Sequence, residues 1–218
     1  MNKRLLLAAC LIAASASAFA QAHRAGRSEI YLSPTFTDGK SYTFDGGSSV
    51  RTDTGFGLAM GYMYNVSNRV AFGGEFAWGD ADYRATIQPG AGNTQSAYNY
   101  NSSLETWTVR FLGNYYFSDG NLAPYVSGGL GWTSIDTNIP AGVPQNVCWW
   151  YPWWGSYCST YVPTKTSTEF SYNAAIGLRY DFGNGFVRGQ VGFQWIDFGG
   201  SYGTGQFTQY RIDFGTKF

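Results

Sequence analysis

The strongest constraint on this chain is a repeated alternation between large apolar residues and small or polar ones. From Gly55 to Tyr64, the even-numbered positions hold Phe, Leu, Met and Tyr, whereas the odd-numbered positions hold mainly Gly and Ala. A period of two indicates a β-strand, because successive side chains of a strand point to opposite faces. The alternation recurs, most weakly in the first segment, at Glu29–Phe36, Val70–Trp78, Glu105–Phe117, Leu122–Trp132, Phe170–Phe182, Val187–Trp195 and Tyr210–Phe218. The chain is therefore predicted to be all-β, with eight strands.

The connections between these strands alternate between short and long. The segments near residues 65–68, 118–121 and 183–185 are short, whereas those near 37–53, 79–104, 134–168 and 197–206 are longer and rich in Gly, Ser, Thr and Asn. This alternation predicts an eight-stranded antiparallel up-and-down transmembrane β-barrel, with short periplasmic turns and four longer external loops. Both termini then fall on the periplasmic side. Pro34 and Pro124 lie inside predicted strands, where we expect bulges or strand ends, since proline cannot donate to the ladder.

Strand length and residue type favour a barrel in a membrane over a soluble one. The ten residues from Trp107 to Phe117 span about 26 Å at roughly 3.4 Å per residue and a tilt of about 40°, close to the apolar band of about 25 Å in such barrels. A soluble lipocalin-type barrel would instead place the large apolar residues in a narrow lumen. The small-residue face holds the glycines and nearly all mid-strand charges, so we predict that this face lines the interior.

The N-terminus has the pattern of a secretory leader. Residues 2–4 make a basic start, Leu5 to Phe19 is apolar, and Ala18 and Ala20 form a small-residue cleavage site. A lipoprotein-like cleavage box ends at Cys10, but too few apolar residues precede it for an ordinary leader core. We therefore expect a cleaved signal peptide at residues 1–20, a short N-terminal segment at 21–27 and an outer-membrane barrel domain at 28–218.

Two cysteines remain after that cleavage, Cys148 and Cys158, both in the third long loop. An exported chain passes through an oxidising compartment, so we predict a disulfide between them. The segment that they bracket is aromatic and contains Trp149, Trp150, Tyr151, Trp153, Trp154 and Tyr157. These rings fit a contact surface for an external ligand, because Trp and Tyr are favoured interface anchors. They fit equally a loop stiffened by rings that pack on one another.

The predicted interior face carries equal numbers of acidic residues and arginines. They are Glu29, Glu75, Asp181 and Asp213, with Arg110, Arg179, Arg188 and Arg211. The interior of an eight-stranded barrel is only wide enough to be filled by side chains, and buried charges must be paired. We predict a salt-bridged polar plug, with Glu75 and Arg110 as a pair at equal depth on adjacent strands. A narrow ion pathway is the alternative interpretation.

With its leader, its eight strands, the strand Pro124–Trp132 and the ending Tyr210–Phe218, the chain resembles the small outer-membrane β-barrel proteins of OmpA/OmpX type, without a peptidoglycan-binding domain. The resemblance implies a bacterial outer-membrane location, with membrane lipid and lipopolysaccharide as surroundings. It also implies recognition by the barrel-assembly machinery, for which the terminal aromatic and alternate apolar residues form the assembly signal: Tyr210, Ile212, Phe214 and Phe218. Thr216 departs mildly from that pattern.

No catalytic, metal or cofactor site is expected. The few enzymes among such barrels generally use a histidine-based site, whereas the single histidine here, His23, lies in the short N-terminal segment without a serine or carboxylate that can be placed beside it. Without the leader the chain has 12 basic and 14 acidic residues, a net charge of −2, so nucleic acid is not an expected partner. We expect a structural or surface-interaction (adhesin-like) protein whose external loops carry any binding. The alternative is a small low-conductance channel for solutes or hydrophobic molecules.

Overall fold

A computed structural model describes residues 23–43, 48–87, 98–140, 145–151, 153, 155–161, 164–198 and 204–218. Between residues 140 and 163 it describes only the side chains of Trp153 and Cys158. The predicted signal peptide lies outside the described residues. No helix in the described part of the chain is long and apolar enough to cross a membrane.

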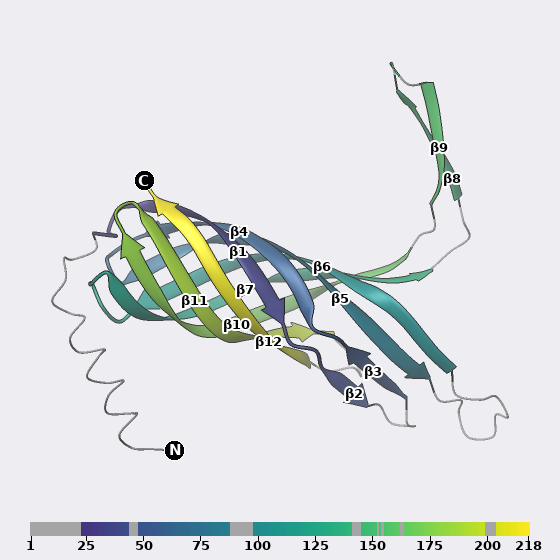
Figure 1. Cartoon of the computed structure of the whole chain (residues 1–218), viewed down its shortest axis with the longest axis horizontal. Helices are drawn as coiled ribbons and strands as arrows, with labels where there is room; N and C mark the ends of the chain where they lie inside the picture. The colour runs from purple at the N-terminus through teal and green to yellow at the C-terminus, as the bar shows by residue number, and fades with distance from the viewer. Residues whose placement is uncertain are drawn as a thin grey trace.

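Eight strands form one closed antiparallel barrel, which confirms the predicted fold class (Figure 1). They are β1 (Ser28–Thr37), β4 (Gly55–Asn65), β5 (Val70–Ile87), β6 (Tyr98–Tyr116), β7 (Leu122–Pro140), β10 (Thr164–Phe182), β11 (Gly185–Asp197) and β12 (Thr204–Lys217). Each pairs with its neighbour in the chain, and β1 closes the barrel by pairing with both β4 and β12. The C-terminus and the start of β1 lie together at the end that carries the short turns.

Four shorter strands lie beyond the barrel wall. β2 (Ser41–Thr43) and β3 (Ser49–Thr52) form a hairpin that pairs with the far end of β5. β8 (Gln145–Tyr151) and β9 (Gly155–Tyr161) form a separate hairpin between β7 and β10, which projects from the long-strand end of the barrel in Figure 1. Both hairpins fall in segments predicted as external loops.

All four of the predicted long loops are partly strand, which corrects the sequence-based prediction. The register of β5 against β6 runs without a shift from Val70↔Tyr115 to Ile87↔Tyr98, well past the rings of Trp78 and Trp107. Beyond those rings the outward positions become polar. The alternation in the sequence is visible only where the outward residues are large and apolar. It therefore does not reveal the strands beyond the apolar band.

The two prolines behave differently. Pro124 is the third residue of β7, close to the last β6–β7 pair at Tyr125, as expected for a strand end. Pro34 lies in the middle of β1 and keeps its register opposite Leu58 of β4. Towards β12 the ladder skips Ser33 and Pro34 but resumes with the same offset. The expected bulge at Pro34 is therefore wrong, because one missing donor on one edge is accommodated without a shift.

The outer surface carries the large apolar side chains, and the interior is packed with rings and charged groups. A Cβ on Gly61 would overlap the Tyr31 ring, and one on Gly177 would come within 2.7 Å of the Tyr125 ring. Small inward residues thus provide the space for large inward ones on neighbouring strands. The interior of the lower barrel is solid, as expected for a barrel of this size.

Candidate functional site

The interior divides along the barrel axis into a charged plug near the short turns and a cavity near the long-strand end. The plug consists of ten buried charged side chains: Arg24, Glu29, Glu75, Arg110, Arg179, Asp181, Arg188, Arg211, Asp213 and Lys217. All eight interior charges predicted from the sequence are among them. Their burial follows from the alternation, since each occupies the inward face of its strand.

The upper part of the plug is centred on Glu75. Its Oε1 accepts a hydrogen bond from Arg110 Nε at 2.7 Å, and its Oε2 accepts one from Arg211 Nη2 at 2.5 Å. The Tyr31 hydroxyl donates a further bond to Oε2 at 2.6 Å. The structure thus brings Glu75 and Arg110 together as their register predicts. The carboxylate has two cationic partners instead of the single one expected.

Asp213 joins the upper part of the plug to Arg188. Its Oδ2 lies 2.9 Å from Arg188 Nε, an ion pair without hydrogen-bond alignment, while its Oδ1 lies 3.5 Å from Arg211 Nη2 and accepts a bond from the Ser33 hydroxyl. The Arg188 guanidinium also lies 4.6 Å from the centre of the Tyr31 ring, close enough for a cation–π contact.

The lower part of the plug is centred on Arg179. Its two terminal nitrogens bind both oxygens of Glu29, at 2.7 and 2.9 Å, in the bidentate geometry that favours arginine over lysine. It also donates to Asp181 at 2.8 Å. Asp181 receives two more cations, Arg24 at 2.9 Å and Lys217 at 2.9 Å. Three positive groups thus converge on one carboxylate.

Arg24 and Lys217 are the members of the plug that sequence reasoning missed. Arg24 is fully buried and donates to the carbonyl oxygens of Asn68, Ser118 and Gly120 at 3.1, 3.0 and 2.6 Å, so it ties two short turns together. From the sequence, Arg24 is expected in the short N-terminal segment outside the barrel. Lys217 could have been found, since it shares the inward face of its strand with Asp213, whereas no periodicity pointed to Arg24.

These two residues change the charge balance of the interior. Among the described residues the plug has six cations and four carboxylates, a formal net charge of +2, where the sequence predicted four of each. Aromatic faces offset part of the excess, because Arg179 lies 4.1 Å from the centre of the Phe186 ring. A closed, cation-rich plug therefore fills the short-turn half of the barrel.

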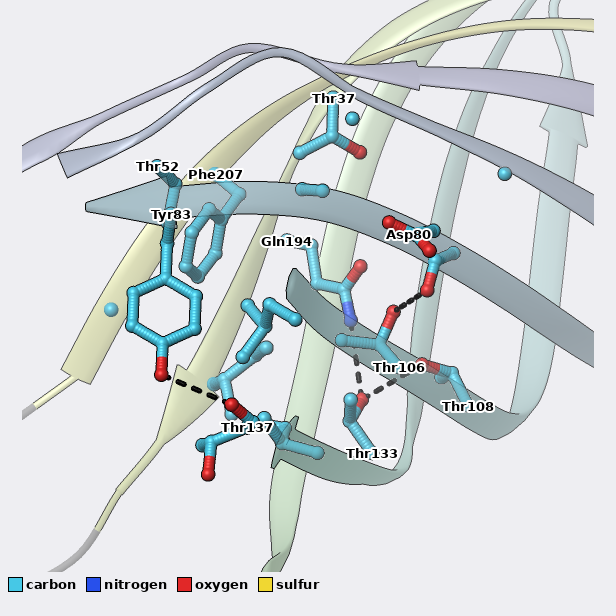
Figure 2. A pocket seen from close by; sticks show the side chains of 18 of the residues that line it. Thr37, Thr52, Asp80, Tyr83, Thr106, Thr108, Thr133, Thr137, Gln194 and Phe207 are labelled. Atoms are coloured by element: carbon cyan, nitrogen blue, oxygen red, sulfur yellow. Dashed lines mark hydrogen bonds between the residues drawn. The ribbon is translucent and has the colours of Figure 1, made fainter. Parts of the chain in front are cut away.

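Above the plug lies a cavity of about 650 Å³, a size typical of small-molecule sites. Figure 2 shows Tyr83 and Phe207 near one side of it and Thr108, Thr133 and Gln194 near another. Its apolar lining includes Leu104, Ile135, Ile139 and Ile196. The cavity begins where the plug ends, since Arg110 belongs to both.

A row of uncharged polar groups forms the base of the cavity. The hydroxyl of Thr133 lies 2.9 Å from that of Thr108, donates to Ser171 at 2.9 Å and accepts from Gln194 Nε2 at 3.2 Å. These four groups lie on the neighbouring strands β6, β7, β10 and β11, and they are hydrogen-bonded to one another. They separate the apolar walls above from the charges below.

Comparison with known proteins agrees with this architecture. The chain matches the outer membrane protein beta-barrel domain family over residues 6–218. It belongs to this family. The protein is located in the bacterial outer membrane, and the apolar outer face of its barrel contacts membrane lipid. A search of curated protein sequences finds no significant match.

Two solved structures share the barrel's fold. Neisserial surface protein A aligns over 89% of this chain and 98% of its own, with a TM-score of 0.51 and 11% identity. The outer membrane protein OprG from Pseudomonas aeruginosa aligns over 91% and 98%, with a TM-score of 0.54 and 14% identity. At these identities the likeness concerns the fold alone.

The other predicted site residues of the outer-membrane barrel lie on its outside. In the β8–β9 hairpin Cys148 is directly opposite Cys158, a register that brings two Cα atoms within disulfide range. Trp153, at the hairpin turn, is 90% exposed, and the side chains of Trp149, Trp150, Tyr151, Trp154 and Tyr157 lie outside the described residues. The disulfide and the role of these rings remain predictions.

The predicted assembly signal and the single histidine are also on the surface. The side chains of Tyr210, Ile212 and Phe214 are exposed on the outer face of β12, and that of Phe218 is exposed directly after the strand ends. His23 is exposed in the segment before β1. No group of His, Cys, Asp or Glu in the described part of the chain is arranged to hold a metal ion.

Proposed function

We propose that this protein is a structural, adhesin-like barrel of the outer membrane, which binds through its outward-facing elements and does not conduct solutes. The plug supports this proposal most directly. Its ten charged side chains are linked by ion pairs, including two that join strands three places apart around the barrel wall, Arg179 with Glu29 and Arg211 with Glu75. Breaking one buried pair costs on the order of 3–5 kcal/mol, so a path through several would be closed at rest.

The outward elements supply surface for binding. The hairpin β8–β9 and the extensions of β5, β6, β7 and β10 project from the long-strand end, and Trp153 exposes a large ring at the hairpin turn. Trp is a favoured anchor residue at binding interfaces. We also propose lipopolysaccharide as a partner, because it surrounds a barrel in the outer membrane. We also propose that the barrel-assembly machinery inserts the chain, and that it has no enzymatic activity.

A small channel is the second candidate function, and one observation favours it. The cavity leads from the long-strand end down to a plug with a net charge of +2, so a transient opening would favour anions. Conductance separates the two candidates, because the first requires a closed lumen.

The test is conductance in planar bilayers of the wild type, Arg24→Ala and Arg27→Ala. We expect no resolved steps for the wild type. Arg24→Ala removes the side chain that bridges the short turns, so it should produce flickering openings. Arg27→Ala is the matched control, an arginine three positions away outside the plug. Steady wild-type steps would contradict the proposal and favour the channel.

A further inference from the structure

The cavity above the plug has the composition of a site for an amphipathic molecule. Its walls above the base include the apolar side chains of Ile135 and Ile196, each 5% exposed. Its base is polar, with the hydroxyls and amide of Thr108, Thr133 and Gln194 (Figure 2). Ligand sites are generally apolar with a few convergent polar groups, which is the arrangement here.

Arg110 gives the base a specific chemistry. It lines the cavity, it is 95% buried, and it lies two residues below Thr108 on the same face of β6. Its Nε donates to Glu75, but in the part of the chain that the structure describes nothing accepts a hydrogen bond from its two terminal nitrogens. A buried guanidinium with donors left over favours an acceptor in the adjacent cavity.

Local charge favours an anionic acceptor over a neutral one. The upper part of the plug has three arginines, Arg110, Arg188 and Arg211, against the two carboxylates Glu75 and Asp213, a formal charge of +1 next to the base. A single carboxylate would balance it. A multiply charged phosphate group fits less well, because Asp38, Asp53, Asp80 and Glu169 also line the cavity.

We propose that the cavity binds a carboxylate-headed amphiphile of the medium-chain fatty-acid class. The carboxylate accepts hydrogen bonds from the terminal nitrogens of Arg110, and the hydrocarbon chain lies along Ile135 and Ile196 towards the mouth. The inference goes beyond the proposed binding role, because it names a ligand class for the cavity inside the barrel. It does not depend on whether the barrel conducts.

The test uses the full barrel in lipid nanodiscs with decanoate labelled with ¹³C at its carboxyl carbon. Binding is followed by the carboxyl NMR shift, with empty nanodiscs subtracted, and decanol, detected by competition, is the neutral ligand of equal chain length. We expect decanoate to bind the wild type on the order of tenfold more tightly than decanol, since charge-assisted hydrogen bonds are the stronger ones. Equal affinities would overturn the assignment of the head group.

Two pairs of variants locate the site. Ile135→Trp fills the cavity and should abolish decanoate binding, whereas Val109→Trp, on the lipid-facing side of β6, should leave it unchanged. Arg110→Gln should bring decanoate down to the affinity of decanol without weakening decanol. Undiminished decanoate binding by Ile135→Trp would show that the ligand lies elsewhere. Bilayer conductance, measured separately, decides the proposed closed state, so either idea can fail alone.

Discussion

Side-chain alternation predicts which residues face the interior, but not which residues they bind. The positions of Glu75 and Arg110 alone predict that they pair, and the structure brings them together. The second arginine on Glu75, Arg211, could not be predicted, because it reaches across the lumen from β12. Such contacts depend on the diameter of the closed barrel, and strand periodicity carries no information about that.

Glu75 binds two arginines, whereas among the described residues Arg110 binds only Glu75, and this difference gives a prediction for the Glu75 cluster. Glu75→Gln leaves two arginines without their carboxylate and should lower the free energy of unfolding by about 3 kcal/mol or more. Arg110→Gln leaves Glu75 with Arg211 and Tyr31, so it should lower it by only about 1 kcal/mol. Urea unfolding in lipid vesicles measures both. Equal losses would mean that Arg211 does not share the carboxylate, and additive losses in the double variant would argue against any coupling between Glu75 and Arg110.

The elements differ in how visible they are to sequence reasoning. Strands that face lipid were found because lipid demands large apolar residues on one face. The outer parts of β5, β6, β7 and β10 were assigned to loops, because water on the outside permits polar residues there. Their hydrogen bonds resemble those of soluble proteins. Asp136 of β7, for example, accepts bonds from Thr164 Oγ1 at 2.7 Å and from the Asn138 amide at 2.9 Å.

These bonds make the junction of β7 and β10 sensitive to acid. The hydrogen bond from Thr164, followed by that from Asn138, lowers the pKa of Asp136 below its usual value of 3.8. A carboxylate with a lowered pKa contributes stability above its usual pKa and loses it as the pH falls through the folded value. The protection of the Asn138 amide against hydrogen exchange, relative to its intrinsic exchange rate at each pH, should therefore fall below about pH 4. Asp136→Asn is the control and should remove that acid dependence; persistence of the effect in it would assign the effect to another group.

The β8–β9 hairpin permits a prediction confined to one element. Replacing both Cys148 and Cys158 by Ser should leave the barrel folded and heat-modifiable on gels, because the hairpin makes a sheet of its own. Closing so short a loop stabilises by at most about 3 kcal/mol, and that effect falls on the hairpin. Thiol alkylation of intact cells without a reductant should label neither cysteine. Labelling of both would rule the disulfide out.

At the scale of the whole molecule, closure depends on the last strand meeting the first. The Phe218 amide donates to the Ser28 carbonyl at 2.9 Å, and the Ser28 amide donates back at 3.0 Å. The predicted assembly signal therefore lies on the seam that closes the barrel. Family resemblance identified that signal, and the closed topology was predicted from alternating connections. The closure of the short-turn end by Arg24 could not be predicted, because a single residue outside the strands belongs to no periodic pattern.

A matched pair of aromatic residues tests the assembly signal. Phe218 and Phe182 are both exposed on the outer surface at the short-turn end, at 62% and 54%. If the barrel-assembly machinery recognises Phe218, Phe218→Ala should lower the amount of folded protein in the outer membrane severalfold. Phe182→Ala should have little effect. Quantifying the heat-modifiable band in membrane fractions measures this. Similar losses in both variants would show that only the loss of an apolar ring matters.

The continuation of β5 and β6 beyond Trp78 and Trp107 determines what kind of epitope this part of the protein presents to antibodies. Nine further residues of β5 follow Trp78 before the strand ends at Ile87, and they stay paired with β6 throughout. At roughly 3.4 Å per residue and a tilt of about 40°, they raise a wall about 23 Å above the aromatic rings. Antibodies that bind this wall recognise a folded, two-stranded epitope, so sera raised against linear peptides from residues 79–87 should stain intact cells poorly.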